Sequence, residues 1–127
     1  MKQRFFICPK CGNILAFVET SGAPVSCCGG EMRELLPGTT EAATEKHIPV
    51  FTVDGNTVTV EVGSVAHPMT EAHHIAWVSL ETKAGNQRKE LDPTGAPRVT
   101  FVMEAGDEVR AVYAYCNLHG LWAATAD

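Results

Sequence analysis

The feature that most constrains this chain is a group of four cysteines near its N-terminus, in the pattern Cys8-x2-Cys11-x15-Cys27-Cys28. A pair spaced by two residues lets both sulfurs reach one ion, and four thiolates form the tetrahedral site of zinc or a single iron. A segment of about 36 residues buries too little apolar surface to fold alone, so it needs such a staple. The first part of the chain is therefore predicted to be a small metal-stapled domain.

The second cysteine pair departs from the usual spacing. Cys27 and Cys28 are adjacent, and because successive side chains diverge, binding one ion requires a sharp bend. Gly29 and Gly30 are expected to supply the backbone freedom for that bend. Zinc ribbons normally repeat the Cys-x2-Cys spacing, so the adjacent pair favours a mononuclear iron that carries an electron. A purely structural zinc and a pair of disulfides stay open as alternatives.

A change in composition divides the chain. Residues 36–46, "LPGTTEAATEK", have no periodicity and predict a linker over 37–44, between a domain over 1–36 and a second domain over 45–127. Beyond it, "VFTVDGNTVTVEV" predicts two strands around an Asp54-Gly55 turn. Further strands are expected over residues 75–81, 98–103, 109–115 and 121–125, with no helix. The predicted fold class is mainly β, with an immunoglobulin-like antiparallel β-sandwich as the second domain.

The net charge and the hydropathy of the chain limit the classes of partner that it is expected to bind. The net charge of −5 disfavours nucleic acids and anionic membranes, which call for a basic surface. The sequence contains neither a signal peptide nor a long apolar run, which predicts a cytoplasmic protein without a membrane span. Thiols stay reduced in that compartment, where clustered cysteines more often bind metal than pair. An anionic substrate would need a local positive charge, because the mean field repels it.

A second group of metal-binding residue types lies in the second domain. All five histidines and the fifth cysteine occur there, at the edges of predicted elements: His47, His67, His73, His74, Cys116 and His119. The end loops of a sandwich can converge on one point, and Cys116 and His119 are close enough in sequence to reach one ion together. This grouping predicts a second metal site.

The donor set indicates which ion this site takes. Four imidazoles and one thiolate exceed the usual four ligands of zinc, and suit an iron with four nitrogens, an axial thiolate and an open opposite position. An axial thiolate directs electron density to the open position, as in thiolate-ligated haem. Lys46, next to His47, is a candidate for the local positive charge, and Glu45 is a candidate ligand of the oxidised metal.

Taken in order, these motifs resemble desulfoferrodoxin, the two-iron form of superoxide reductase, over essentially the whole chain. The resemblance rests on "CPKCGN…CCGGEM", "EKHIP", "HPMTEAHHI" and "YCNLHGLW". It implies a desulforedoxin-like N-terminal domain with an FeS4 centre held by Cys8, Cys11, Cys27 and Cys28. It also implies a non-haem iron in the second domain, with the ligands His47, His67, His73, His119 and axial Cys116. His74 is set aside as a neighbour of the ligand His73.

The resemblance further implies the activity. The expected reaction is the one-electron reduction of superoxide to hydrogen peroxide, without production of dioxygen, at the ferrous His4Cys iron. Glu45 would bind ferric iron, and Lys46 would attract the substrate and help to protonate it. A homodimer and a rubredoxin-like electron donor are implied as partners, and the N-terminal centre would be dispensable for the chemistry. Two other readings stay open: a two-iron electron carrier without its own substrate, and a zinc-stapled binding module.

Overall fold

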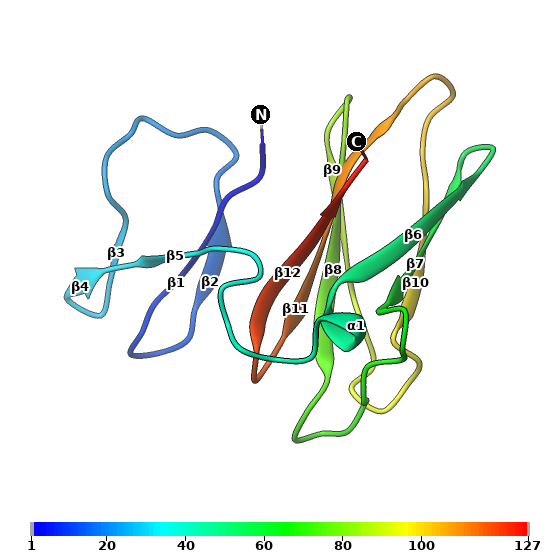
Figure 1. Ribbon diagram of the computed structural model, residues 1–127. Helices are drawn as coiled ribbons and strands as arrows, with labels where there is room; N and C mark the ends of the chain where they lie inside the picture. The colour runs from blue at the N-terminus through cyan, green and yellow to red at the C-terminus, as the bar shows by residue number, and fades with distance from the viewer. Residues whose placement is uncertain (1, 127) are drawn as a thin grey trace. The chain divides into compact units, whose positions relative to one another are not determined.

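The computed structural model describes residues 2–126, and the chain forms two compact units with the boundary between Leu36 and Pro37 (Figure 1). The first unit holds a three-stranded antiparallel sheet in the order β2-β1-β5, made of β1 (Phe5–Ile7), β2 (Ile14–Ala16) and β5 (Arg33–Leu35). A two-stranded ribbon of β3 (Ser26–Cys27) and β4 (Gly30–Glu31) completes it.

The first unit has a small apolar interior. Its buried hydrophobic side chains are Phe5, Cys8 and Met32. Arg4 spans two strands, because its guanidinium makes two hydrogen bonds of 2.9 Å to the Glu34 carboxylate and lies 5.2 Å from the centre of the Phe6 ring. So few buried side chains agree with the expectation that a unit of this size depends on a metal staple.

The second unit is a sandwich of two antiparallel sheets. One sheet has the order β10-β7-β6, from β6 (Pro49–Asp54), β7 (Thr57–Val62) and β10 (Arg98–Val102). The other has the order β12-β11-β8-β9, from β8 (Ile75–Thr82), β9 (Asn86–Glu90), β11 (Val109–Cys116) and β12 (Gly120–Thr125). The predicted fold class, mainly β with a small cysteine-rich domain and a larger antiparallel β domain, is confirmed.

Period-two alternation accounts for the core. Val58, Val60 and Val62 of β7 are almost completely buried, whereas Glu61 between them is exposed. They pack against residues of both sheets, including Phe101 and Leu80. Strands with alternating apolar residues bury one face, and two such faces enclose this core.

One strand was not predicted. β9 lies outside the strands expected from the sequence. All five of its side chains are exposed, and no apolar alternation marks it. Backbone pairing to β8 forms this strand. Two of its side chains then join the sheets at their edge: Lys89 Nζ donates to Thr100 O at 2.6 Å, and Gln87 Nε2 donates to Val102 O at 2.9 Å.

The expectation of no helix was also wrong. Residues Thr44–His47 form a single helical turn, α1, closed by the Ile48 N–H donating to Thr44 O at 2.9 Å. It ends at Ile48 because the ring of Pro49 excludes the helical conformation from the preceding residue. His47 therefore ends a helix and does not open a strand. No helix among residues 2–126 is long and apolar enough to cross a membrane.

Candidate metal centres

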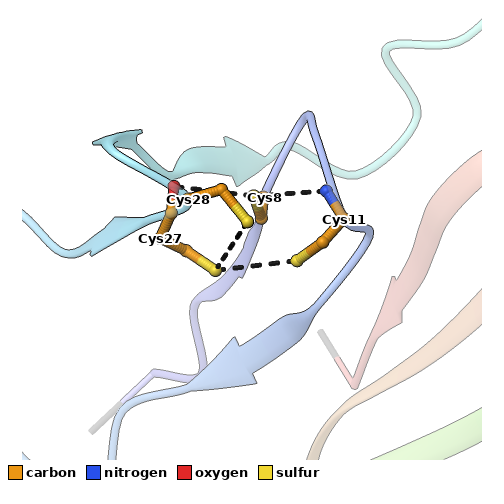
Figure 2. Close-up of side chains that lie close together, drawn as sticks. All are labelled: Cys8, Cys11, Cys27 and Cys28. Atoms are coloured by element: carbon orange, nitrogen blue, oxygen red, sulfur yellow. Dashed lines mark hydrogen bonds between the residues drawn. The ribbon is translucent and has the colours of Figure 1, made fainter.

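The four N-terminal cysteines converge on one point (Figure 2). All four sulfurs lie within 4.8 Å of one another, with Cys11 Sγ 3.6 Å from Cys27 Sγ and Cys27 Sγ 3.9 Å from Cys28 Sγ. A tetrahedral ion with metal–sulfur bonds of about 2.3 Å places its sulfurs about 3.8 Å apart. The cluster therefore fits a metal, whereas a disulfide needs sulfurs about 2.0 Å apart, and all five cysteines are free.

Two turns present these sulfurs. After β1, the Cys8 N–H donates to Asn13 O, and the Cys11 N–H donates to Cys8 Sγ at 3.5 Å. In the β3–β4 hairpin, Cys28 and Gly29 are the central residues, and both have positive φ angles, 54° and 75°. Two positive φ angles are the geometry of a type I′ turn. The expected bend thus exists, but it falls on Cys28 and Gly29, whereas Gly30 belongs to β4.

The thiols affect one another's ionisation. The Cys11 N–H donates to Cys8 Sγ and lowers the pKa of Cys8 to about 6. Hydrogen bonding among the sulfurs, that with Cys11 first, raises the pKa of Cys28 to about 12, and the same causes raise the pKa of Cys27. Four thiolates so close together need a cation, and a metal that binds here displaces the remaining protons.

A second cluster lies at one end of the sandwich. Donor atoms of His47, His67, His73 and Cys116 all lie within 4.8 Å of one another. His119 joins them through Nδ1, which is 3.2 Å from His47 Nε2 and 3.8 Å from Cys116 Sγ. Cys116 ends β11 and His119 lies in the turn before β12. All five donors named from the sequence are therefore brought together.

The four imidazoles form a square. Neighbouring ring centres lie 4.6–5.1 Å apart with planes 77–83° to each other, and the opposite pair, His47 and His73, are 6.4 Å apart. Two neighbouring nitrogen pairs are 3.2 Å apart: His47 Nε2 with His67 Nε2, and His47 Nε2 with His119 Nδ1. An ion at the centre of a nitrogen square with bonds of about 2.1 Å needs about 3.0 Å between neighbours. The cluster fits one ion.

Hydrogen bonds select the tautomers. His47 Nδ1 lies 2.7 Å from Ala43 O, and His67 Nδ1 lies 2.7 Å from Pro68 O. A carbonyl oxygen only accepts, so both Nδ1 atoms carry protons and both Nε2 lone pairs face the cluster. Burial lowers the pKa of His67 to about 4, which keeps this imidazole neutral at neutral pH.

One buried nitrogen of the imidazole cluster lacks a hydrogen-bond partner among the described residues. His73 Nε2 is buried and has no hydrogen-bond partner among the described residues. Burial also lowers the pKa of His73, which favours the neutral imidazole, the form that binds a metal. A buried nitrogen without a partner is costly unless it binds a ligand, and a metal at the centre of the square satisfies it.

The remaining sequence candidates lie outside the square. Glu45 and Lys46 are exposed on α1, directly before His47. His74 is directed to its own loop, where its Nδ1 lies 2.9 Å from Thr70 O, in agreement with its having been set aside. The N–H of Asn117, the residue after Cys116, donates to His74 O at 3.2 Å.

Two residues near the square were not singled out from the sequence. The Trp122 ring lies 5.0 Å from that of His47, and its Nε1 donates to His119 O at 3.0 Å. A Cβ on Gly63 would lie 2.6 Å from Glu45 O and 2.8 Å from Ile48 O. Glycine at position 63 therefore permits the close approach of α1. Nothing in a periodic pattern marks either contact, since both join distant segments.

A tetrathiolate unit followed by a β-sandwich with an imidazole square beside one thiolate defines a two-centre metalloprotein. Residues 39–125 match the family model described as desulfoferrodoxin. The desulfoferrodoxin of Nitratidesulfovibrio vulgaris is 44% identical over 98% of both chains. The crystal structure of the superoxide reductase from Treponema pallidum matches with a TM-score of 0.83 and 46% identity, over 98% of this chain and 100% of that one.

The chain belongs to the desulfoferrodoxin family. Its two clusters are consistent with the two iron centres of a desulfoferrodoxin. The one-iron superoxide reductase of Giardia intestinalis is a shorter relative. It is 32% identical to this chain with a TM-score of 0.55, and the match covers 65% of this chain and 98% of the Giardia protein.

Proposed function

We propose that this chain is a superoxide reductase that converts superoxide to hydrogen peroxide. The observation that carries the proposal is the square of four imidazoles, two buried and two half-buried, beside the buried Cys116 thiol, with the lone pairs of His47 and His67 directed inward. Family membership and the relatives titled superoxide reductase support it. An iron held by these residues would supply one electron, and superoxide would take up that electron and two protons to give hydrogen peroxide.

The ligand assignment is part of this proposal. His47, His67, His73, Cys116 and His119 would hold the iron of the second centre. Cys8, Cys11, Cys27 and Cys28 would hold the iron of the N-terminal centre, which we place in a domain over residues 1–36. The linker over 37–44 and the superoxide reductase domain over 45–127 complete the proposed organisation.

We also assign roles in the reaction to Lys46 and Glu45. The Lys46 ammonium would draw superoxide in against the net charge of −5 and position a proton donor. The Glu45 carboxylate would fill the open position in the oxidised protein. Both are exposed residues of α1, within two positions of His47.

The finer proposals concern partners and location. We propose a homodimer that receives electrons from a rubredoxin-like donor in the cytoplasm. The five free cysteines are compatible with a reducing compartment. Sedimentation of the iron-loaded protein tests the dimer, and reduction by purified rubredoxin tests the donor.

Rapid mixing tests the activity. Ferrous protein mixed with a small excess of superoxide should be oxidised at the second centre and should yield one peroxide per electron, without dioxygen. An electron carrier without its own substrate would show no fast, stoichiometric oxidation by superoxide, and that result would refute the proposal. A zinc-stapled binding module would show neither colour nor electron transfer.

A further inference from the structure

Asn117 lies between two proposed ligands, Cys116 and His119, and extends its side chain to the loop that carries a third. Its Oδ1 accepts a hydrogen bond from the His74 N–H at 2.9 Å, and its Nδ2 donates to Ala72 O at 3.0 Å. Its backbone N–H donates to His74 O at 3.2 Å. One residue therefore binds the backbone on both sides of His73.

His73 depends on its backbone more than His47 and His67 do. The rings of His47 and His67 are oriented by hydrogen bonds from Nδ1 to carbonyl oxygens. Within residues 2–126, the buried Nε2 of the His73 ring has no partner, and no hydrogen bond of that ring is found to orient it. The direction of this imidazole is thus set by the position of its own peptide groups.

The rest of that loop is held locally. The His73 N–H donates to Thr70 O at 3.2 Å and to Thr70 Oγ1 at 3.1 Å, and the Thr70 N–H donates to His73 O at 2.9 Å. These bonds close a turn over residues 70–73, but they connect it to nothing outside the loop. Through the side chain of Asn117 the closed turn is attached to the segment that carries the thiol.

We propose that Asn117 is a positioning residue that couples His73 to Cys116, so that the His73 imidazole and the Cys116 sulfur are held as one rigid unit. The inference rests on the proposed iron site. Without the amide, the turn over residues 70–73 would shift relative to the end of β11. The iron would then be held less firmly, because hydrogen bonds to the residues that bind a metal keep those residues in the orientation that binding needs.

The test compares N117A with L118A in the full-length, iron-loaded protein. N117A removes both side-chain hydrogen bonds but retains the backbone bond to His74 O. L118A truncates the next residue of the same turn, whose side chain is 58% exposed. Under reducing conditions, a ferrous chelator should remove iron from the second centre about 10–100-fold faster in N117A, and the thiolate absorption of the oxidised centre should shift.

L118A should retain the parental rate of iron loss and the parental absorption, and iron at the N-terminal centre provides an internal reference in every sample. A parental rate of iron loss in N117A would overturn the proposal. N117D retains the acceptor for the His74 N–H but cannot donate to Ala72 O, so we expect iron loss faster than in the parent. If N117D lost iron at the parental rate, the hydrogen bond from Asn117 to Ala72 O would not be needed, and the proposed attachment on both sides of His73 would be wrong.

A measurement on the parental protein covers the case in which N117A does not fold. The amide hydrogens of His74 and Asn117 should exchange slowly with solvent, because each is hydrogen-bonded across the two segments. Exchange at the rate of an open loop would refute the coupling. Iron retention and amide exchange do not require superoxide chemistry, so a failure of the proposed activity leaves this test intact.

Discussion

The two candidate metal centres are built in opposite ways. The N-terminal cluster takes its sulfurs from two tight turns, and Cys11 and Cys28 are exposed. The second cluster takes its donors from a helical turn, two loops and a strand end, and there His47, His67 and Cys116 are buried, with 3%, 2% and 0% exposure. Four sulfurs close a tetrahedron and leave an ion no free position, which suits storage of an electron. Four nitrogens and one sulfur leave one position open, which suits chemistry on a bound substrate.

Folding contributes differently to each. The first cluster joins two turns that are fewer than 20 residues apart, and one of them depends on the positive φ angles of Cys28 and Gly29. The second joins positions as far apart in sequence as His47 and His119, so it exists only once the sandwich core has formed. Damage to the core should therefore disrupt the second centre first.

The largest effect should come from C116S. This change replaces the only thiolate among the five donors of the second centre by a weakly donating hydroxyl. Because loss of an outer hydrogen bond alone typically costs 10–100-fold, superoxide reduction should fall by more than about 100-fold. Rapid mixing measures the rate, and absorption of the N-terminal centre should be unchanged. A parental rate would show that the Cys116 sulfur is not needed for the reaction.

The converse change is C28S. It removes one of four sulfurs and should abolish the iron absorption of the N-terminal centre. Superoxide reduction at the second centre should persist, as the match to a one-iron superoxide reductase over only 65% of this chain suggests. Iron analysis should fall from two irons per chain toward one. A loss of activity in iron-loaded C28S would show that the centres do not work independently.

G63A tests how α1 is held against the second centre. A Cβ at this position would lie 2.6 Å from Glu45 O, so the backbone that carries Glu45, Lys46 and His47 must shift. A misplacement of 1 Å can cost about 100-fold in rate, and we expect a loss of about tenfold with the N-terminal centre unaffected. G85A is the matched control, because a Cβ there meets nothing within 4 Å. Equal rates in the two variants would contradict the role of Gly63.

K46A should reduce the rate of superoxide capture by about three- to tenfold at low ionic strength, because electrostatic attraction to the site is lost. The dependence of the rate on salt should flatten at the same time. K83A changes the net charge equally at another exposed position and should leave both the rate and its salt dependence near the parental values. If the two variants behave alike, only net charge matters and Lys46 has no special role.

The smallest effect concerns N13A. The Asn13 Nδ2 donates to Cys27 Sγ at 3.7 Å, and such a bond stabilises the more negative, reduced form of a tetrathiolate centre. A loss of about 0.5–1 kcal/mol would lower the reduction potential by about 20–40 mV. Redox titration measures it, with the second centre as the internal reference. An unchanged potential would show that this hydrogen bond does not tune the centre.

Much of the fold and both donor sets could be predicted from the sequence. Alternation at Val58, Val60 and Val62 identified a sheet face, and the strands around it agree closely with those observed. The secondary-structure predictions failed at β9 and α1, where the types of the side chains do not indicate a strand or a helix. β9 has no apolar face, and α1 is a single turn whose end is set by Pro49.

By itself the sequence determined the chemistry that is available: four clustered thiols, four converging imidazoles and a fifth thiol, in an order that identified the family. Those properties belong to residue types and spacings, which act locally. Only the tertiary structure decided that the imidazoles form a square, that His73 Nε2 is buried with no partner in the described part of the chain, and that Asn117 attaches two ligand loops. Such contacts join residues far apart in the chain, and packing of the two sheets brings them together.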